Sequence, residues 1–350
     1  MEIEQQVIDK AQKATTFRPL LEVRSLRKFF PIERGILRRV VGHVRAVDDI
    51  SFVIGQGETL GLVGESGSGK TTLGRCILRT IEPDSGEILM HLDDGTVDVM
   101  QADTMQLRAV RRDMQMVFQD PYSSLNPRKT VMEIVSEPLR YQKLAKRIDL
   151  EKHVRELLQT VGLSTRHMNR YPHAFSGGQR QRIGVARALS LHPKLIVCDE
   201  PVSALDVSVQ AQILNLLKDL QSEFNLTYLF IAHDLSVVKH ISDRVAVMYV
   251  GQIVELAPTD TLYRDPKHPY TEALLSSVPQ PDPDQPLQEI ALKGEIANPA
   301  NPPAGCYFHP RCHYNDGSRC VTETPALREV EPGRFARCHY AETLSLRGLH

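Results

Sequence analysis

The chain has 350 residues, and its 42 Lys and Arg against 43 Asp and Glu give a formal net charge of −1. This length is sufficient for one folded core and an appended domain. The balanced charge excludes the overall basic surface that is typical of nucleic-acid-binding proteins. A membrane span needs about 20 mostly apolar residues, whereas the longest apolar runs, such as Val245 to Val250, have the length of a strand.

Residues 1–20 are polar and are expected to form a flexible lead-in. They begin Met1-Glu2-Ile3-Glu4, which is acidic and lacks the apolar core of a signal peptide, so we expect the chain to remain in the cytosol. An Arg-rich segment follows the first predicted strand and contains Arg34, Arg38, Arg39 and Arg45. Most runs of this kind are solvated loops, and a loop near anionic lipid or a partner subunit is the alternative.

A glycine-rich loop lies between a predicted strand, 59–63, and a predicted helix that begins at Thr71. Glycines allow backbone N–H groups to converge on phosphate oxygens, and the helix N-terminus adds the positive end of its dipole. Lys70 can then reach the β- and γ-phosphates, and the Thr71 hydroxyl can ligate Mg²⁺. The pattern predicts a nucleotide site rather than a plain flexible turn. Its candidate residues are Gly64, Glu65, Ser66, Gly67, Ser68, Gly69, Lys70, Thr71 and Thr72.

Two helical stripes flank a second glycine-rich segment. The region from 130 to about 171 is predicted to be helical, and the stripe at 154–161 has the spacing of one helix face. The same spacing recurs over 209–224, and we interpret both stripes as core packing. Between them lies the signature segment, which reads Ser176-Gly177-Gly178-Gln179-Arg180-Gln181.

Two adjacent carboxylates end a predicted buried strand. Four apolar residues, 195–198, precede Asp199 and Glu200, and Pro201 follows them. A pair of acidic residues on a surface loop would usually be solvated. Here the pair follows a predicted buried strand, which favours the interpretation that the two carboxylates belong to a functional site. Asp199 can hold Mg²⁺ through water, and Glu200 can orient or deprotonate an attacking water.

These motifs together resemble the ATPase subunit of an ABC transporter. In that family Gln119, after an apolar strand, matches the Q-loop glutamine that contacts metal and water. Asp206 matches the D-loop, and His233 matches the switch histidine that reads the γ-phosphate. The resemblance also suggests an aromatic residue that stacks on adenine, either Phe30 or equally Phe29.

The resemblance implies that two ATP molecules bind between two chains. Each ATP would lie between one chain's phosphate-binding loop and the signature segment of its partner, with Ser176, Gly177, Gly178 and Gln179 as its contacts. Because this chain has one of each motif, it is expected to need a second ATPase subunit. Phe175 stands where the family usually has leucine, which changes nothing catalytic.

The flanking segments are similar to ATP-binding subunits of dipeptide and oligopeptide importers. The similarity lies in 119–128, 206–214 and 266–275 and covers about residues 20–340. The Arg-rich insertion fits the second of the two ATPases that such importers carry. The expected partners are a homologous ATPase, two membrane permeases and, indirectly, a solute-binding protein. The chain would lie on the cytoplasmic face of the inner membrane. An importer of nickel or another solute, and a non-transport regulatory ATPase, remain alternatives.

The implied fold is an α/β P-loop ATPase of the ABC type, with an antiparallel β subdomain, an α-helical signature subdomain and a C-terminal extension. We assign 1–20 to the lead-in, 21–257 to the ATPase domain with its helical subdomain at about 128–185, and 258–350 to the extension. The expected ligands of the ATPase are ATP and Mg²⁺, with Thr71, Gln119 and Asp199 as metal contacts.

The extension contains seven prolines between 279 and 303 and four of the six cysteines. The prolines predict a semi-rigid connection. Clustered cysteines in a cytosolic protein favour metal or redox chemistry, and four thiolates suit a [4Fe–4S] cluster. Zinc, with His309, His313 or His339 as possible substitutes, and no metal are the alternatives. The four are Cys306, Cys312, Cys320 and Cys338, while Cys76 and Cys198 are expected to be packing residues.

Overall fold

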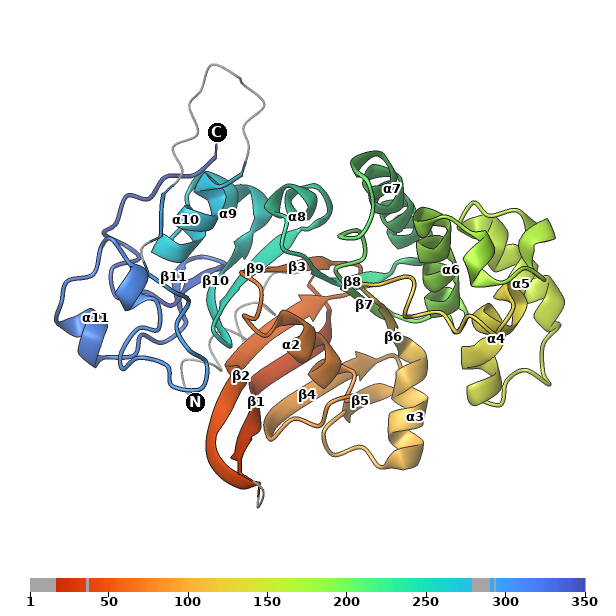
Figure 1. Cartoon of the computed structure of the whole chain (residues 1–350), viewed down its shortest axis with the longest axis horizontal. Helices are drawn as coiled ribbons and strands as arrows, with labels where there is room; N and C mark the ends of the chain where they lie inside the picture. The colour runs from red at the N-terminus through yellow and green to blue at the C-terminus, as the bar shows by residue number, and fades with distance from the viewer. Residues whose placement is uncertain (1–16, 36–37, 279–289, 293, 350) are drawn as a thin grey trace. The chain divides into compact units, whose positions relative to one another are not determined.

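A computed structural model describes residues 17–35, 38–278, 290–292 and 294–349. The chain forms two compact units. Unit 1 is built from the described parts of Met1–Gly55, Thr59–Met100 and Ala232–His350, and unit 2 from Gln56–Glu58 and Gln101–Ile231. Unit 1 therefore contains both the predicted phosphate-binding loop and the extension, drawn in orange and blue in Figure 1. Residues 1–16 of the lead-in and residues 279–289 and 293 of the proline-rich connection fall outside the described residues.

Unit 1 begins with an antiparallel sheet. Its order is β2-β1-β4-β5, and its strands are β1 (Pro19–Arg34), β2 (Arg39–Gly55), β4 (Ser85–Leu92) and β5 (Gly95–Asp98). The inner parts of β1 and β2 are buried, whereas their outer parts are exposed, including Val40 and Val41. The antiparallel subdomain predicted for this region is therefore present.

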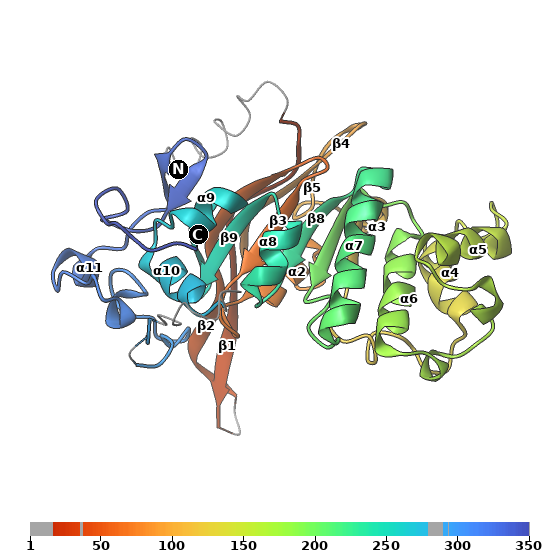
Figure 2. The ribbon, with the colours of Figure 1, turned by 90° about the horizontal axis from the view of Figure 1, so that it is seen from above.

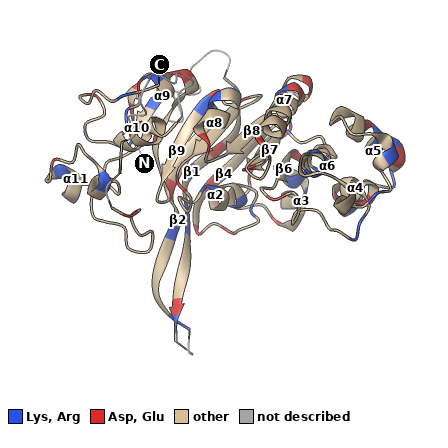
Figure 3. Cartoon of the chain, turned by 45° about the horizontal axis from the view of Figure 1, so that its top comes forward, with Lys and Arg blue, Asp and Glu red and all other residues tan. Residues whose placement is uncertain are grey.

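We expected the Arg-rich segment to be a solvated loop, and this prediction is wrong. The segment is the outer part of a long hairpin. Arg34 ends β1 and Arg39 begins β2, and the two residues pair across the strands. Figure 2 shows β1 and β2 running side by side toward the tip, and Figure 3 shows charged residues of both signs there. The sequence resembles a loop because its side chains are charged. Strand pairing nevertheless continues there, because the backbone N–H and C=O groups that form it do not require apolar side chains.

A second sheet of unit 1 joins the nucleotide motifs to the extension. Its order is β11-β12-β10-β9-β3. Strand β3 (Thr59–Val63) is parallel to β9 (Arg244–Tyr249), and β10 (Gln252–Pro258) is antiparallel to β9. The last two strands, β11 (Arg328–Glu331) and β12 (Arg334–Ala336), come from the extension. Strand β12 pairs with β10, and β11 pairs with β12, both antiparallel. The extension is thus attached to the core more closely than the sequence suggests.

Short helices complete unit 1. Helix α2 (Lys70–Ile77) follows β3, as predicted, and α8 (Leu235–Ile241) precedes β9. The others are α9 (Thr259–Arg264), α10 (Pro269–Ser276), α11 (Arg319–Thr322) and a 3-10 turn at His309–Arg311.

Unit 2 combines three parallel strands with five α-helices, counted in its described residues. The strand order is β8-β7-β6, with β6 (Met114–Val117), β7 (Leu195–Asp199) and β8 (Thr227–Ile231). The helices are α3 (Thr104–Asp113), α4 (Val131–Tyr141), α5 (Leu150–Thr160), α6 (Gly177–Leu189) and α7 (Val207–Phe224). Strands β6 and β7 confirm the apolar strands predicted before Gln119 and Asp199.

The helices of unit 2 begin at strong N-caps. Thr130 caps α4 and Asp149 caps α5 through side-chain oxygens that accept backbone N–H groups. The stripe of α5 is buried, and α7 buries Ile213, Leu216, Leu217 and Leu220, as expected. The last stripe position, Phe224, is instead 40% exposed, because the helix ends there and the chain turns at Asn225.

Cys76 and Cys198 are fully buried, which confirms them as packing residues. Burial raises the pKa of the Cys76 thiol to about 12, so this thiol stays protonated. Within the described ranges, none of the helices has both the length and the apolar character that a membrane crossing needs.

Candidate functional site

The phosphate-binding loop connects β3 to α2 and packs tightly against the core of unit 1. Gly64 and Gly69 have φ values of 149° and 106°. A Cβ at Gly64 would lie 2.1 Å from the Met248 carbonyl oxygen, and one at Gly69 would lie 1.9 Å from the Ala46 carbonyl oxygen. Only glycine fits these two positions. The loop is therefore fixed from both sides, while Ser66 and Gly67 remain exposed.

Lys70 is buried and turns back onto its own loop. Its Nζ donates to the carbonyl oxygens of Gly64, at 2.7 Å, and Glu65, at 2.9 Å. Thr71 and Thr72 follow in the first turn of α2 and are half-buried, and that turn has no acidic side chain. An ammonium group, a helix N-terminus and partly accessible hydroxyls together form a surface that can accept an anion.

His233 lies next to this loop in the fold of unit 1. The Ala232 N–H donates to the Leu62 carbonyl at 3.1 Å, so the chain leaves this position beside the end of β3. His233 is exposed, and Asp234 after it caps α8 by accepting the Ser236 N–H. Unit 1 thus brings the predicted switch histidine and the phosphate-binding loop to the same strand end, although 162 positions separate His233 from Thr71 in sequence.

The two candidate aromatic residues differ in exposure. Phe30 is 37% exposed and has the Lys28 ammonium 5.4 Å from its ring centroid. Phe29 is half-buried, pairs with Arg45 across the hairpin and has that guanidinium 5.8 Å from its ring. The greater exposure of Phe30 favours it as a stacking platform.

In unit 2, Gln119 and Glu200 meet at the ends of neighbouring strands. The Gln119 Nε2 donates to the Glu200 Oε2 at 2.9 Å. This contact follows from register, because Val117 of β6 lies beside Cys198 of β7. Asp199 is buried at the end of β7. An amide and two carboxylates therefore lie together at one strand edge, which is a donor set suited to a hydrated divalent cation.

Glu200 has an unusual backbone conformation for a non-glycine residue, with φ at 45°. Its N–H donates to the Ile231 carbonyl at 3.0 Å, and its own carbonyl accepts from the Ser203 hydroxyl at 3.1 Å. These bonds hold the strained conformation. Strain of this kind is found preferentially at functional sites.

The signature segment forms the N-terminus of α6. The Ser176 hydroxyl accepts from the Gln179 N–H at 3.4 Å, and the Gln179 side-chain oxygen accepts from the Ser176 N–H at 3.1 Å, which is a capping box. A Cβ at Gly178 would lie 2.4 Å from a Val209 methyl group of α7. The glycines therefore let α6 and α7 pack closely while Ser176 stays exposed.

Asp206, the D-loop candidate, caps α7. Its carboxylate accepts from the Ser208 hydroxyl at 2.8 Å and the Val209 N–H at 3.0 Å. These bonds, that of Ser208 first, lower the pKa of the Asp206 carboxyl. It is exposed, so the same charged group is also accessible to a partner.

The four cysteines of the extension line one pocket in unit 1, together with His309 and His339. Burial raises the pKa of Cys312 to about 12 and of Cys338 to about 11. All six cysteines of the chain are free thiols. Across the described residues, no group of three or more His, Cys, Asp or Glu side chains is arranged to hold a metal ion. The structure therefore brings the predicted ligands together without supporting the predicted iron–sulfur cluster.

The comparisons with known proteins match both parts of the chain. The family model of ABC transporters matches residues 47–203, and that of the oligopeptide/dipeptide transporter C-terminal region matches 254–320. The chain is 52% identical over 322 residues to the oligopeptide transport ATP-binding protein AppF of Bacillus subtilis strain 168, covering 91% of this chain and 97% of that protein. The chain belongs to the ABC transporter ATPase family. It is also 53% identical to the probable peptide ABC transporter ATP-binding protein y4tS of Sinorhizobium fredii, covering 91% and 89%.

Solved structures agree with this membership. The dimeric post-hydrolysis structure of the ATP-binding cassette MJ0796 with ADP and Pi has a TM-score of 0.59 and 28% identity, and it covers 69% of this chain and 99% of that one. The structure of cbiO1 from Clostridium perfringens has a TM-score of 0.58 and 26% identity, with 70% and 91% covered. The predicted ABC ATPase fold and ATPase activity are thereby confirmed.

A contact that sequence reasoning missed joins this ABC ATPase's extension to its phosphate-binding loop. Arg311 donates to both carboxylate oxygens of Glu65, and the Tyr270 hydroxyl accepts from the Glu65 N–H at 2.9 Å. Arg311 and Glu65 are 246 positions apart, so no local pattern links them. The only signal is an arginine placed directly before Cys312 in the cysteine-containing segment.

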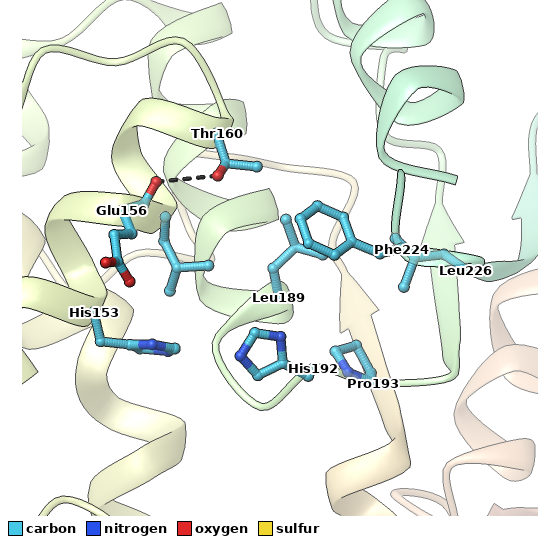
Figure 4. A pocket seen from close by; sticks show the side chains of 9 residues that line it. His153, Glu156, Thr160, Leu189, His192, Pro193, Phe224 and Leu226 are labelled. Carbon is cyan, nitrogen blue, oxygen red and sulfur yellow. Dashed lines mark hydrogen bonds between the residues drawn. The ribbon is translucent and has the colours of Figure 1, made fainter. Parts of the chain in front are cut away.

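A cavity in unit 2 contains none of these motif residues. It has a volume of about 430 Å³. Apolar and polar side chains line it together: Leu157, Leu189, Pro193, Phe224 and Leu226 with His153, Glu156, Thr160 and His192. Figure 4 shows the two imidazoles at one side of this cavity and Phe224 at another. The ring centroids of His153 and His192 are 5.6 Å apart.

Proposed function

We propose that this ABC ATPase hydrolyses ATP to power the import of dipeptides or oligopeptides through a membrane permease. The observation that carries the catalytic part is the Gln119–Glu200 hydrogen bond at the carboxyl end of two parallel strands. It places an amide beside a carboxylate that can accept a proton from water. The peptide part is supported by relatives that are named as peptide and oligopeptide transport ATP-binding proteins.

In unit 1, we assign phosphate binding to the loop of residues 64–72. The converging N–H groups and Lys70 would bind the β- and γ-phosphates, and Thr71 would ligate Mg²⁺. The Lys70 ammonium would exchange its two loop carbonyls for phosphate oxygens, which are stronger partners. Phe30 would stack on adenine, and His233 would contact the γ-phosphate.

In unit 2, we assign water activation and metal contacts. Glu200 would take the proton of the attacking water, with Gln119 orienting both the carboxylate and the water. Asp199 would hold Mg²⁺ through water. The metal would neutralise charge that develops on the phosphates, and the residues around it need only position the water and receive its proton.

The signature segment and Asp206 are proposed to act on the ATP of a second ATPase subunit. The exposed Ser176 at a helix N-terminus supports this role, because such an end attracts phosphate. One chain supplies one phosphate-binding loop and one signature segment, so a pair of chains completes two sites. The partner would be a homologous ATPase, with this chain as the second of the two, and both would dock on two permeases at the cytoplasmic face of the membrane. A solute-binding protein would deliver the peptide from the other side.

The cysteine pocket is proposed to take up a [4Fe–4S] cluster, with zinc as the alternative metal. Support comes from four thiols around one pocket, a donor set that suits such a cluster. Because burial keeps these thiols protonated, ligation would have to displace their protons. The bound group would stabilise the fold of the extension. Anaerobic purification followed by iron, sulfide and zinc analysis tests this assignment, and a folded protein without either metal would exclude it.

The catalytic proposal is tested by measuring phosphate release from the purified chain alone and with a homologous ATPase and permeases. We expect a low rate for the isolated chain and a higher rate per chain in the complex. A high rate that does not depend on protein concentration in the isolated chain would exclude the two-chain site. Copurification with integral membrane proteins would distinguish a transporter subunit from a regulatory ATPase.

A further inference from the structure

Glu65 is held by two side chains that lie far from it in sequence. Arg311 Nη1 donates to one Glu65 carboxylate oxygen at 2.8 Å, and Nη2 donates to the other at 3.1 Å. The Tyr270 hydroxyl accepts the Glu65 N–H at 2.9 Å. Both the side chain and the backbone of this residue of the phosphate-binding loop are therefore fixed from the C-terminal part of unit 1.

The ion pair has the geometry and surroundings of a strong one. The side chain of Arg311 is only 7% exposed, and that of Glu65 is 25% exposed. Two parallel hydrogen bonds between a guanidinium and a carboxylate are specific in direction as well as strong. The Glu65 carboxylate, followed by smaller contributions, raises the pKa of Arg311 above its already high value. Arg311 is thus permanently charged, and its removal would leave a partly buried carboxylate without its partner.

Arg311 is itself fixed by aromatic packing. It ends the 3-10 turn His309–Arg311, and its N–H donates to the Phe308 carbonyl at 3.0 Å. The Phe308 ring is buried and lies 5.3 Å from the Tyr249 ring and 5.4 Å from the Tyr270 ring. One aromatic cluster therefore positions both of the groups that bind Glu65.

The contact continues from Glu65 to the lysine of the loop. The Glu65 carbonyl accepts from the Lys70 ammonium at 2.9 Å. A shift of the Glu65 peptide would move one of the two carbonyls that hold Lys70 in place. The extension, Glu65 and Lys70 thus form a continuous chain of polar contacts within unit 1.

We propose that Arg311 is a positioning residue for the phosphate-binding loop. The extension therefore contributes to the nucleotide site by fixing the conformation of this loop. Arg311 acts through Glu65, whose conformation it fixes before ATP arrives, rather than by touching the nucleotide. Preorganisation of this kind increases affinity because the loop loses less freedom on binding. This inference rests on the proposed function, because it assumes that the loop binds ATP.

The test is equilibrium binding of a fluorescent ATP analogue to the full chain, with its thermal unfolding midpoint measured in parallel. We expect Arg311→Ala to weaken binding about five- to thirtyfold, the factor that corresponds to one or two kcal/mol. Arg319→Ala is the matched control, because Arg319 forms an exposed ion pair with Glu323 in the same segment and its loss should leave affinity unchanged. Glu65→Gln should weaken binding similarly, and combining it with Arg311→Ala should add little.

Arg311→Lys provides the second readout if the alanine variant does not fold. This variant keeps the positive charge but loses the bidentate hydrogen bonding to the Glu65 carboxylate. We therefore expect an affinity for the analogue between those of the wild type and the alanine variant, at a nearly unchanged unfolding midpoint. Wild-type affinity in a folded Arg311→Ala or Arg311→Lys variant, or strictly additive effects with Glu65→Gln, would overturn the proposal. If the wild-type chain itself does not bind the analogue, the proposed function fails instead.

Discussion

Replacing Glu200 by Gln separates water activation from nucleotide binding. Gln has the same shape as Glu, and its amide oxygen can still accept the hydrogen bond that the Gln119 Nε2 now donates at 2.9 Å. The backbone contacts that hold Glu200 at φ 45° do not involve the side chain. The substitution therefore removes mainly the ability to take up a proton, which an amide lacks.

The expected loss follows from that single change. Loss of a general base typically lowers the rate by about 10²–10⁴-fold, which is about 2.7–5.5 kcal/mol of transition-state stabilisation. A change to Ala is less informative, because it would also remove the acceptor for Gln119. ATP affinity should remain near normal in the Gln variant, so ATP would hold the paired ATPases closed.

The assay is steady-state phosphate release from the complex, together with ATP binding and the fraction of closed ATPase pairs. Lys70→Ala serves as the contrast, because it removes the ammonium that we assign to the phosphates and should weaken binding itself. Near-normal turnover of Glu200→Gln would refute the assignment of Glu200 as the base. Loss of ATP binding in that variant would show that the carboxylate acts in binding instead.

Three further predictions concern packing, pH and base stacking. Gly178→Ala should destabilise unit 2 by about 1–3 kcal/mol through overpacking against Val209. Gly184→Ala is the control, because a Cβ there would meet nothing within 4 Å, and it should be neutral or stabilising. Equal unfolding midpoints of the two variants would contradict the overpacking. Partial desolvation of the His192 ring, together with the neighbouring His153 imidazole, lowers the pKa of His192. Below about pH 6.5 the unfolded chain therefore binds this proton more readily and stability should fall slightly; His192→Asn should flatten that decline, and an unchanged pH profile would count against it. Phe30→Ala should weaken ATP affinity more than Phe29→Ala, by about 1–3 kcal/mol for a lost stack, and a larger effect at Phe29 would reverse the assignment.

Local pattern was sufficient to predict the strands and helices around each motif. The glycines, the lysine and the threonine of the loop at 64–71 follow one another in the order of a phosphate-binding motif. That motif predicts a buried strand before the loop and a helix after it. Asp199 ends a buried strand because four apolar residues precede it. These features depend on neighbouring residues, so sequence order carries them.

Long-range pairing could not be predicted in the same way. The Arg-rich segment continues a hairpin because backbone hydrogen bonds do not require apolar side chains, which are the main signal of a strand. Strands β11 and β12 join the sheet because β12 pairs with β10. The paired residues Glu255 and Ala336 are about 80 positions apart in the sequence. The Glu65–Arg311 ion pair depends on that same folding back, so a single sequence contains no pattern for it.

The peptide-import function is tested most directly by ATP-driven uptake of a labelled peptide into vesicles that contain the permeases, the partner ATPase and this chain. We expect uptake that requires ATP and this chain and that is abolished when Glu200→Gln replaces the wild-type chain. ATP hydrolysis by the assembled complex without uptake of any peptide, or with uptake of a different solute only, would contradict the peptide-import assignment. Equal uptake with the Glu200→Gln chain would contradict its role in driving transport.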